Sequence, residues 1–160
     1  MIAVATSTVR SRLATLGLLA VLAVLAVPWS VQVFSGRDAT FVFAWGLVNT
    51  NPPMVTTLPE FLLLYTRGLP EYILAWPLSV GVYAAALASA GVGWWTGLED
   101  PRVTAGLLVV AAVAQAQLAW GFSIQPNRVA WPIGSVVLVT AAAMHYWAHT
   151  RGAGERGDAR

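Results

Sequence analysis

The chain has 160 residues, of which 58% are apolar and only 10% are charged. Ordinary soluble domains carry about 25% charged residues, so this chain lacks the polar side chains needed to cover a core in water. It contains no cysteine and its formal charge is only +2. These values exclude disulfides and thiolate chemistry, and they argue against a nucleic-acid partner.

Charged residues are absent from four stretches that are long enough to cross a bilayer. A helix rises 1.5 Å per residue, so about 20 residues cross a hydrocarbon core of roughly 30 Å. The sequence therefore predicts an all-α, polytopic membrane protein with four transmembrane helices. The expected single domain covers residues 1–150, with spans at 13–34, 73–94, 103–123 and 129–149, and a disordered tail follows at 151–160. Asp100 and Pro101 predict the N-cap and first residue of the third span.

Residues 35–72 are expected to form one long loop on the outer side. Its uncharged part, residues 39–59, includes the run Asn49-Thr50-Asn51-Pro52-Pro53, which cannot satisfy its backbone in lipid. This part is therefore predicted to be an external loop, either re-entrant or resting on the interface. The sequence Thr57-Leu58-Pro59-Glu60 matches a capping box and predicts a short, interfacial amphipathic helix.

Arginine placement predicts that both termini lie in the cytoplasm and that the chain is a multi-pass protein of the cell membrane. Cytoplasmic loops are enriched in basic residues. Arg10 and Arg12 before an apolar segment also resemble a secretory signal, but the apolar stretch is longer than usual, which favours an uncleaved anchor. The arginines expected inside are Arg10, Arg12, Arg102, Arg151, Arg156 and Arg160, and those expected outside are Arg37, Arg67 and Arg128.

Two histidines and two acidic residues are expected near the inner membrane surface. His145 and His149 are four residues apart and share a helical face, while Glu99 and Asp100 lie in the inner loop. Two imidazoles and one or two carboxylates suit zinc or iron. The alternative, that His149 is a solvated helix end and His145 packs at the interface, is favoured because no motif such as His-Glu-x-x-His is present. Catalytic residues and a cofactor are accordingly not predicted.

Two further groups of polar residues are candidates for contacts. Gln115 and Gln117 lie within the third span, where an amide either bonds to a neighbouring helix or lines a polar path, and the bond is favoured. The outer loop holds the most polar cluster, which either contacts a partner or ligand or is simply solvated. Its members are Asn49, Asn51, Glu60, Arg67 and Glu71.

Several short runs resemble a family of small uncharacterised four-span membrane proteins of halophilic archaea. The resemblance extends over nearly the whole chain and implies a fold and a membrane location without an activity. The runs are Val27-Pro28-Trp29-Ser30-Val31, Trp45-Gly46-Leu47-Val48-Asn49-Thr50-Asn51-Pro52-Pro53, Arg67-Gly68-Leu69-Pro70, Ala75-Trp76-Pro77 and Glu99-Asp100-Pro101-Arg102-Val103-Thr104.

Three functional hypotheses follow. The leading one is a non-enzymatic accessory or scaffold subunit that presents the outer loop to another membrane protein, with a homo-oligomer also considered. The second is a small transporter or channel-like protein in which Gln115 or Gln117 lines a path. The third is a membrane-bound metalloenzyme that uses His145 and His149.

Overall fold

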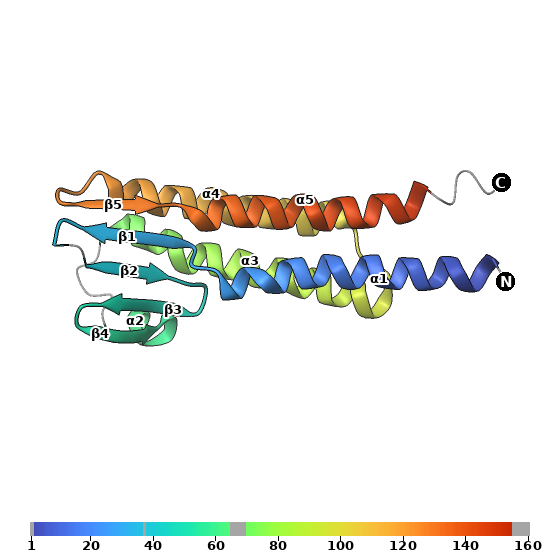
Figure 1. The fold of residues 1–160 in the computed structure, drawn as a ribbon, viewed down its shortest axis with the longest axis horizontal. Helices are drawn as coiled ribbons and strands as arrows, with labels where there is room; N and C mark the ends of the chain where they lie inside the picture. The colour runs from blue at the N-terminus through green and yellow to red at the C-terminus, as the bar shows by residue number, and fades with distance from the viewer. Residues whose placement is uncertain (1, 37, 65–69, 155–160) are drawn as a thin grey trace.

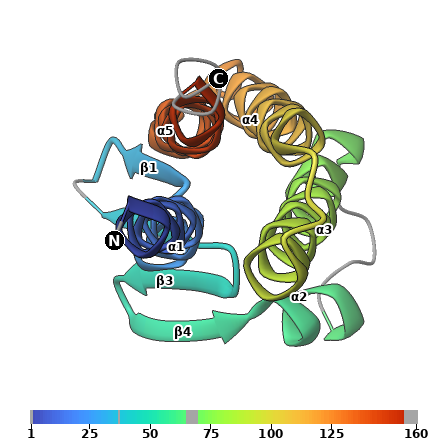
Figure 2. The ribbon, with the colours of Figure 1, turned by 90° about the vertical axis from the view of Figure 1, so that its right-hand side faces the viewer.

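In the computed structural model, four long helices form a bundle and a five-stranded sheet lies at one end of it (Figure 1). The structure describes residues 2–36, 38–64 and 70–154, and the side chains of residues 12–36, 38–64 and 70–150. The long helices are α1 (Ile2–Ala23), α3 (Ala75–Thr96), α4 (Pro101–Ser123) and α5 (Ile133–Gly154). Both α1 and α4 pack on α3 and on α5, so the four helices form a closed ring (Figure 2).

The sheet is antiparallel throughout, with the strand order β4-β3-β2-β1-β5. Its first four strands form a meander, and the last, which leads into α5, pairs with β1. A short helix, α2 (Leu58–Leu64), follows the meander, and the 3₁₀ turn η2 (Glu71–Leu74) precedes α3. The strands are β1 (Ser30–Phe34), β2 (Ala39–Val42), β3 (Gly46–Thr50), β4 (Pro53–Thr57) and β5 (Arg128–Trp131).

Pro28 explains why the first helix ends inside an apolar stretch. Proline lacks an N–H, and its ring clashes with the carbonyl four residues earlier, which here belongs to Val24. The residue before a proline is also driven to extended backbone, and Val27 has φ −101° and ψ 137°. After the 3₁₀ turn η1 (Val24–Ala26), the chain therefore continues as strand β1.

Aromatic side chains satisfy carbonyl groups at this helix end. The Tyr83 hydroxyl donates to the carbonyl of Val21 at 2.8 Å, and the Trp29 indole N–H donates to that of Val24 at 3.0 Å. The indole of Trp45 reaches the carbonyl of Leu25 at 3.3 Å. The last carbonyls of a helix lack helical partners, and leaving them unpaired in an apolar interior is costly.

Trp29 also fixes the start of α5. Its side chain is fully buried and stands edge-on to Tyr83, with ring centroids 5.2 Å apart. The backbone N–H of Gly134 donates to the Trp29 carbonyl at 2.7 Å. A β-carbon on Gly134 would lie 2.6 Å from the Trp29 α-carbon, so only glycine allows this close approach.

A second apolar cluster joins the sheet and α2 to the bundle. Trp76 of α3 is almost fully buried, and its indole N–H donates to the carbonyl of Phe43 at 3.0 Å. Its ring packs edge-on against Phe61 of α2, and Val42 and Leu118 complete the cluster. The sheet is therefore attached to the helices by side-chain packing as well as by the chain connections.

The predicted all-α class with four transmembrane helices is wrong. The protein contains a five-stranded sheet, and within the described residues two helical segments, Glu71–Thr96 and Pro101–Ser123, are long and apolar enough to cross a membrane. The apolar part of the first helix, Arg12–Ala26, is shorter. The stretch 13–34 is not one helix, because β1 follows Pro28. The stretch 129–149 is not one helix either, because its first residues pair with β1.

Other predicted elements agree with the structure more closely. The stretches 73–94 and 103–123 correspond to α3 and α4, but the long outer loop at 35–72 contains three strands and α2. The capping box is confirmed, because the Glu60 carboxylate accepts from the backbone N–H of Thr57 at 2.8 Å and from its hydroxyl at 2.9 Å. Residues 151–154, expected in a disordered tail, continue α5, and 155–160 lie outside the described residues.

Candidate metal centre

Local sequence signals hold Glu99 in a short connection between α3 and α4. Gly97 ends α3 in the left-handed conformation, with φ 71°, and its N–H donates to the carbonyl of Gly93 at 2.8 Å. The Asp100 carboxylate then accepts from the backbone N–H of Arg102 at 2.9 Å, and Pro101 occupies the first position of α4. This confirms the predicted N-cap. Glu99 therefore lies two residues after Gly97, the C-cap of α3, and one residue before Asp100, the N-cap of α4.

The Glu99 side chain points into the bundle rather than to the surface. It is only 3% exposed, and it fits there because Gly93 has no β-carbon, which would overlap the carboxyl group. The Thr104 hydroxyl donates to Glu99 Oε1, and the Ser89 hydroxyl bonds to that of Thr104 at 2.8 Å. Side chains of α3 and α4 therefore fix the orientation of this carboxylate.

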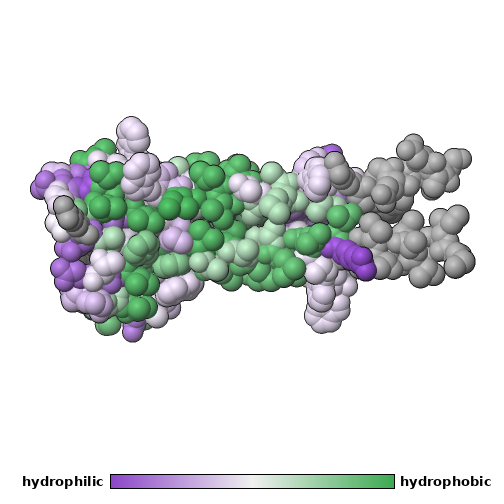
Figure 3. Space-filling view, viewed as in Figure 1, coloured by the Kyte–Doolittle hydropathy of each residue, from purple (hydrophilic) through white to green (hydrophobic). Residues whose placement is uncertain are grey.

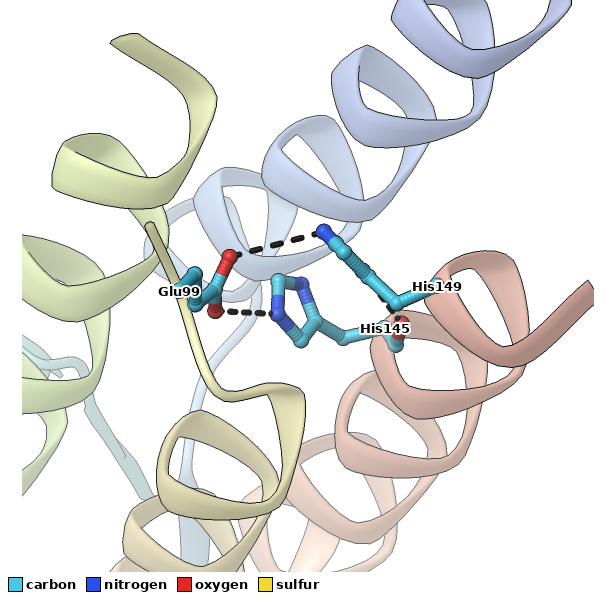
Figure 4. A group of neighbouring side chains, drawn as sticks. All are labelled: Glu99, His145 and His149. Carbon is cyan, nitrogen blue, oxygen red and sulfur yellow. Dashed lines mark hydrogen bonds and ion pairs between the residues drawn. The ribbon is translucent and has the colours of Figure 1, made fainter. Parts of the chain in front are cut away.

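The two histidines approach Glu99 from α5 (Figure 4). His145 is 1% exposed, and its Nε2 lies 2.6 Å from Glu99 Oε1. The side chain of His149 is 21% exposed, and its Nε2 lies 3.4 Å from Glu99 Oε2. The two imidazoles are neighbours on one helical face, with ring centroids 4.5 Å apart. One donor atom from each of the three residues lies within 4.8 Å of the other two.

The hydrogen bonds assign the protons of the two imidazoles. His149 Nδ1 lies 2.9 Å from the backbone carbonyl of His145, and a carbonyl oxygen can only accept, so this nitrogen carries the hydrogen. Likewise His145 Nε2 donates to the Glu99 carboxylate. In the neutral imidazoles, the lone pairs therefore lie on His145 Nδ1 and His149 Nε2.

Each member of the group thus has one anchored atom and one free atom. Glu99 Oε2 and His145 Nδ1 are buried without a hydrogen-bond partner. His149 Nε2 faces Glu99 Oε2, which is itself an acceptor. The two buried acceptor atoms without a donor are unfavourable, because unsatisfied polar groups there cost about 1–3 kcal/mol each. A cation between Glu99 and the two Nε2 atoms that face it, in place of the proton on His145 Nε2, would compensate the charge of the buried carboxylate.

The structure brings together three of the four predicted metal candidates. Glu99, His145 and His149 form the group, whereas Asp100 caps α4 and takes no part. The sequence analysis did not identify Gly93, Thr104 or Ser89. A glycine inside an apolar helix six residues before an isolated glutamate was the available signal for the first of these.

The predicted intramembrane polar residues have different environments. Gln115 is fully buried, and its amide donates to the Ser79 hydroxyl at 2.6 Å, which joins α4 to α3. Gln117, two residues further, is exposed on the outside of the bundle. The first observation favours the helix-to-helix bond, and neither residue supports the proposed polar path.

The described members of the predicted outer polar cluster have hydrogen-bond partners outside the cluster or lie exposed. Asn49 accepts from the Thr40 hydroxyl at 2.7 Å, and Asn51 donates to Asp38 at 3.1 Å. Glu71 begins η2 and is exposed, and Arg67 lies outside the described residues. Glu60 is engaged in its cap, where the hydrogen bonds from Thr57 hold the pKa of its carboxyl below the usual value.

Comparison with known proteins gives a family but no activity. The sequence profile of a family described as a domain of unknown function, DUF8050, matches residues 3–156. The chain belongs to this family. The DUF8050 match includes all the elements that build the metal-ligand group, from α1 to α5. A search of curated proteins finds no match.

The packing of Glu99 against α3 predicts a difference between two neighbouring glycines. Gly93→Ala should displace the Glu99 carboxylate, break its bonds to Thr104 and His145, and destabilise the protein by about 1–3 kcal/mol, as overpacking does. Gly91→Ala is the matched control, because nothing lies within 4 Å of its β-carbon position. Thermal unfolding in detergent should show a lower midpoint for Gly93→Ala alone; equal midpoints for the two variants would contradict the packing described.

Proposed function

We propose that the protein binds a divalent transition-metal ion through Glu99, His145 and His149. The observation that carries the proposal is the buried Glu99 carboxylate with one nitrogen of each histidine facing it, His145 Nε2 at 2.6 Å and His149 Nε2 at 3.4 Å. Two imidazoles and one carboxylate are a ligand set for zinc and for non-haem iron(II).

Distances support this assignment. Metal bonds of about 2.0–2.2 Å in a tetrahedral site place neighbouring donor atoms roughly 3.4 Å apart. Glu99 Oε2 and His149 Nε2 are already 3.4 Å apart. Metal-ligating histidines usually donate their other N–H to a carbonyl or carboxylate, which fixes the ring and the tautomer. His149 does so here, because its Nδ1–H donates to the backbone carbonyl of His145.

The metal proposal is tested by equilibrium binding to the purified protein. Titration with Zn²⁺ or Co²⁺ should give one site per chain, and Glu99→Gln or His149→Ala should weaken binding by at least about 100-fold, since even outer-shell partners are worth 10–100-fold. Asp100→Asn is the control, because asparagine keeps the helix cap and this residue is not a ligand. Failure of the wild-type protein to bind either ion under reducing conditions removes the proposal.

We further propose that the bundle is embedded in a cell membrane, with α3 and α4 crossing it. In an apolar stretch of 18 residues within each of these two helical segments, only 33% and 44% of the residues are buried inside the protein. A core helix of a soluble protein would be mostly buried, whereas these helices expose valine and tryptophan side chains such as Val110, Val113 and Trp120. The surface of the bundle is accordingly dominated by apolar residues in the space-filling view (Figure 3).

The proposed orientation places the metal centre at the cytoplasmic end. The start of α1, the end of α5 and the connection that carries Glu99 lie toward the end of the bundle opposite the sheet (Figure 1). Within the described residues, Arg10, Arg12, Arg102 and Arg151 lie toward this end and Arg128 lies in the sheet, which supports a cytoplasmic location by the positive-inside rule. From the resemblance to membrane proteins of halophilic archaea, we also propose that the protein comes from such an organism. Its measurements should therefore be made at high salt.

Membrane embedding predicts a simple fractionation result. The expressed protein should remain in the membrane pellet after extraction at alkaline pH and should need detergent for release, because its exposed apolar surface has no other solvent. A reporter fused to the C-terminus should be active only in the cytoplasm. Protein that stays in the supernatant without detergent would refute the membrane proposal, and an external reporter would reverse the orientation.

A second candidate function is the accessory subunit, which one observation favours. Strand β4 forms an edge of the sheet, and its side chains Met54 and Val55 are 46% and 58% exposed. Open apolar edge strands offer unpaired backbone groups to another chain. This edge is suited to pair with a strand of a partner membrane protein on the outer side.

The accessory proposal predicts a complex that depends on this edge. Purification from native membranes in mild detergent should yield a stoichiometric partner, and Val55→Lys should remove it, because charge on an edge strand opposes pairing. Leu63→Lys on α2 serves as the control, since Leu63 is exposed but belongs to a helix and not to the edge strand. Recovery of the chain without any stoichiometric partner, or equal loss in both variants, counts against this function.

A further inference from the structure

The outward face of the sheet carries an apolar row that crosses all five strands. Successive side chains of a strand point to opposite faces, and the neighbours Val42 and Thr56 are buried on the face toward the bundle. The row therefore lies on the other face, where its two end members are 60% and 58% exposed. The strand register places the members of the apolar row directly opposite one another, in the order Trp131, Val31, Phe41, Val48 and Val55.

The two ends of the sheet differ in polarity. The turn between β2 and β3 consists of Phe43, Ala44 and Trp45, and its two aromatic rings are stacked with centroids 4.8 Å apart. Turns in water usually consist of glycine, proline, asparagine, aspartate and serine. Residues of that kind form the turns at the opposite end of the sheet, which include Ser35, Gly36, Asp38, Asn51, Pro52 and Asn127. Hydrophilic residues accordingly occupy the far end of the sheet in the space-filling view, and the apolar surface of the bundle continues onto its near end (Figure 3).

The apolar turn is level with the outer ends of α3 and α4. The Phe43 carbonyl accepts from Trp76, the second residue of α3, and Val42 packs in one cluster with Leu118, five residues before the end of α4. The two helices have 22 and 23 residues, so they are about 33–35 Å long, slightly more than the roughly 30 Å of a hydrocarbon core. Because these helices are proposed to cross the membrane, their outer turns and the near end of the sheet lie at the outer boundary of that core.

We infer that the outward face of the sheet contacts the lipid of the outer leaflet, with the apolar row in the interfacial layer and the polar turns in water. This inference rests on the proposed membrane embedding. It is supported by the continuity of the row with the exposed apolar surface of the bundle, and by Trp131, since tryptophan is enriched at membrane interfaces. An antiparallel sheet with one face in water would instead carry polar residues on that face.

The depth of the sheet follows from its dimensions and from the open edge of β4. The interfacial layer on each side of a bilayer is about 5–8 Å thick, and side chains two residues apart along a strand are about 7 Å apart. The layer therefore holds the apolar row but not the polar turns beyond it. A deeper position would expose the unpaired backbone groups of β4 to hydrocarbon, which is unfavourable because no water is present there.

Fluorescence quenching in vesicles tests this placement. The chain contains no cysteine, so a single introduced cysteine carries a fluorophore at a defined position. After reconstitution into phosphatidylcholine vesicles, labels on Val55→Cys and Trp131→Cys should be quenched by a lipid with a nitroxide near its headgroup. They should be severalfold less sensitive to iodide than a label on Ser35→Cys in the far turn. Val113→Cys is the matched control for lipid contact, because Val113 is 64% exposed on α4 and its label should be quenched by a nitroxide deeper in the lipid chain.

The outcomes separate this inference from the membrane proposal. A Val113→Cys label that is insensitive to both nitroxide lipids overturns the membrane embedding itself. If that label responds to lipid, iodide quenching of the row labels as strong as at Ser35→Cys shows that the face lies in water and overturns the inference. Protection of the row labels from both iodide and lipid shows that protein covers the face, as in a dimer, and also overturns it. Val55 and Trp131 lie on opposite edge strands, so one variant remains a test if the other does not fold.

Discussion

Polar groups inside an apolar bundle need partners, and this constraint shapes most of the structure. Helix α1 ends at Ala23, shortly before Pro28, and the carbonyls of Val21 and Val24 accept hydrogen bonds from Tyr83 and Trp29. Trp29 is consequently held in the core, and it fixes where β1 leaves and where α5 begins. The sheet owes its position to this helix end.

The same constraint gives the metal-ligand group its significance. The buried amide of Gln115 has the Ser79 hydroxyl as a partner for its N–H group, and Thr104 has Ser89. Glu99 Oε2, His145 Nδ1 and Gln115 Oε1 are buried without a partner among the described residues, although each of these side chains is held through its second atom. Of these atoms, Glu99 Oε2 belongs to the group with the two imidazoles, where a cation would compensate its charge.

Glycines allow the helices and the connection to come together around this group. Gly97 ends α3, Gly93 leaves space for the Glu99 side chain, and Gly17 lets α1 approach both imidazoles. Each acts through the absence of a β-carbon, but in a different way: one by backbone conformation and two by space. The ligand group therefore depends on residues that carry no chemistry of their own.

The sequence by itself determined the features that arise from local signals. The segments of α3 and α4 were predicted closely because Asp100, Pro101 and the surrounding charges mark them within a few residues. The capping box at Thr57 and Glu60 was predicted for the same reason, since its partners are three residues apart.

Only the tertiary structure decided the sheet and the assembly of the site. Strand β1 pairs with residues 39–42 and 128–131, and an apolar run such as residues 30–34 suits a helix or a strand until those partners are known. Glu99 and His145 are separated by 46 positions, so sequence placed them at the same end of the bundle without bringing them into contact. Gly17 lies against the imidazoles of His145 and His149 through helix packing alone, for which a single sequence carries no signal.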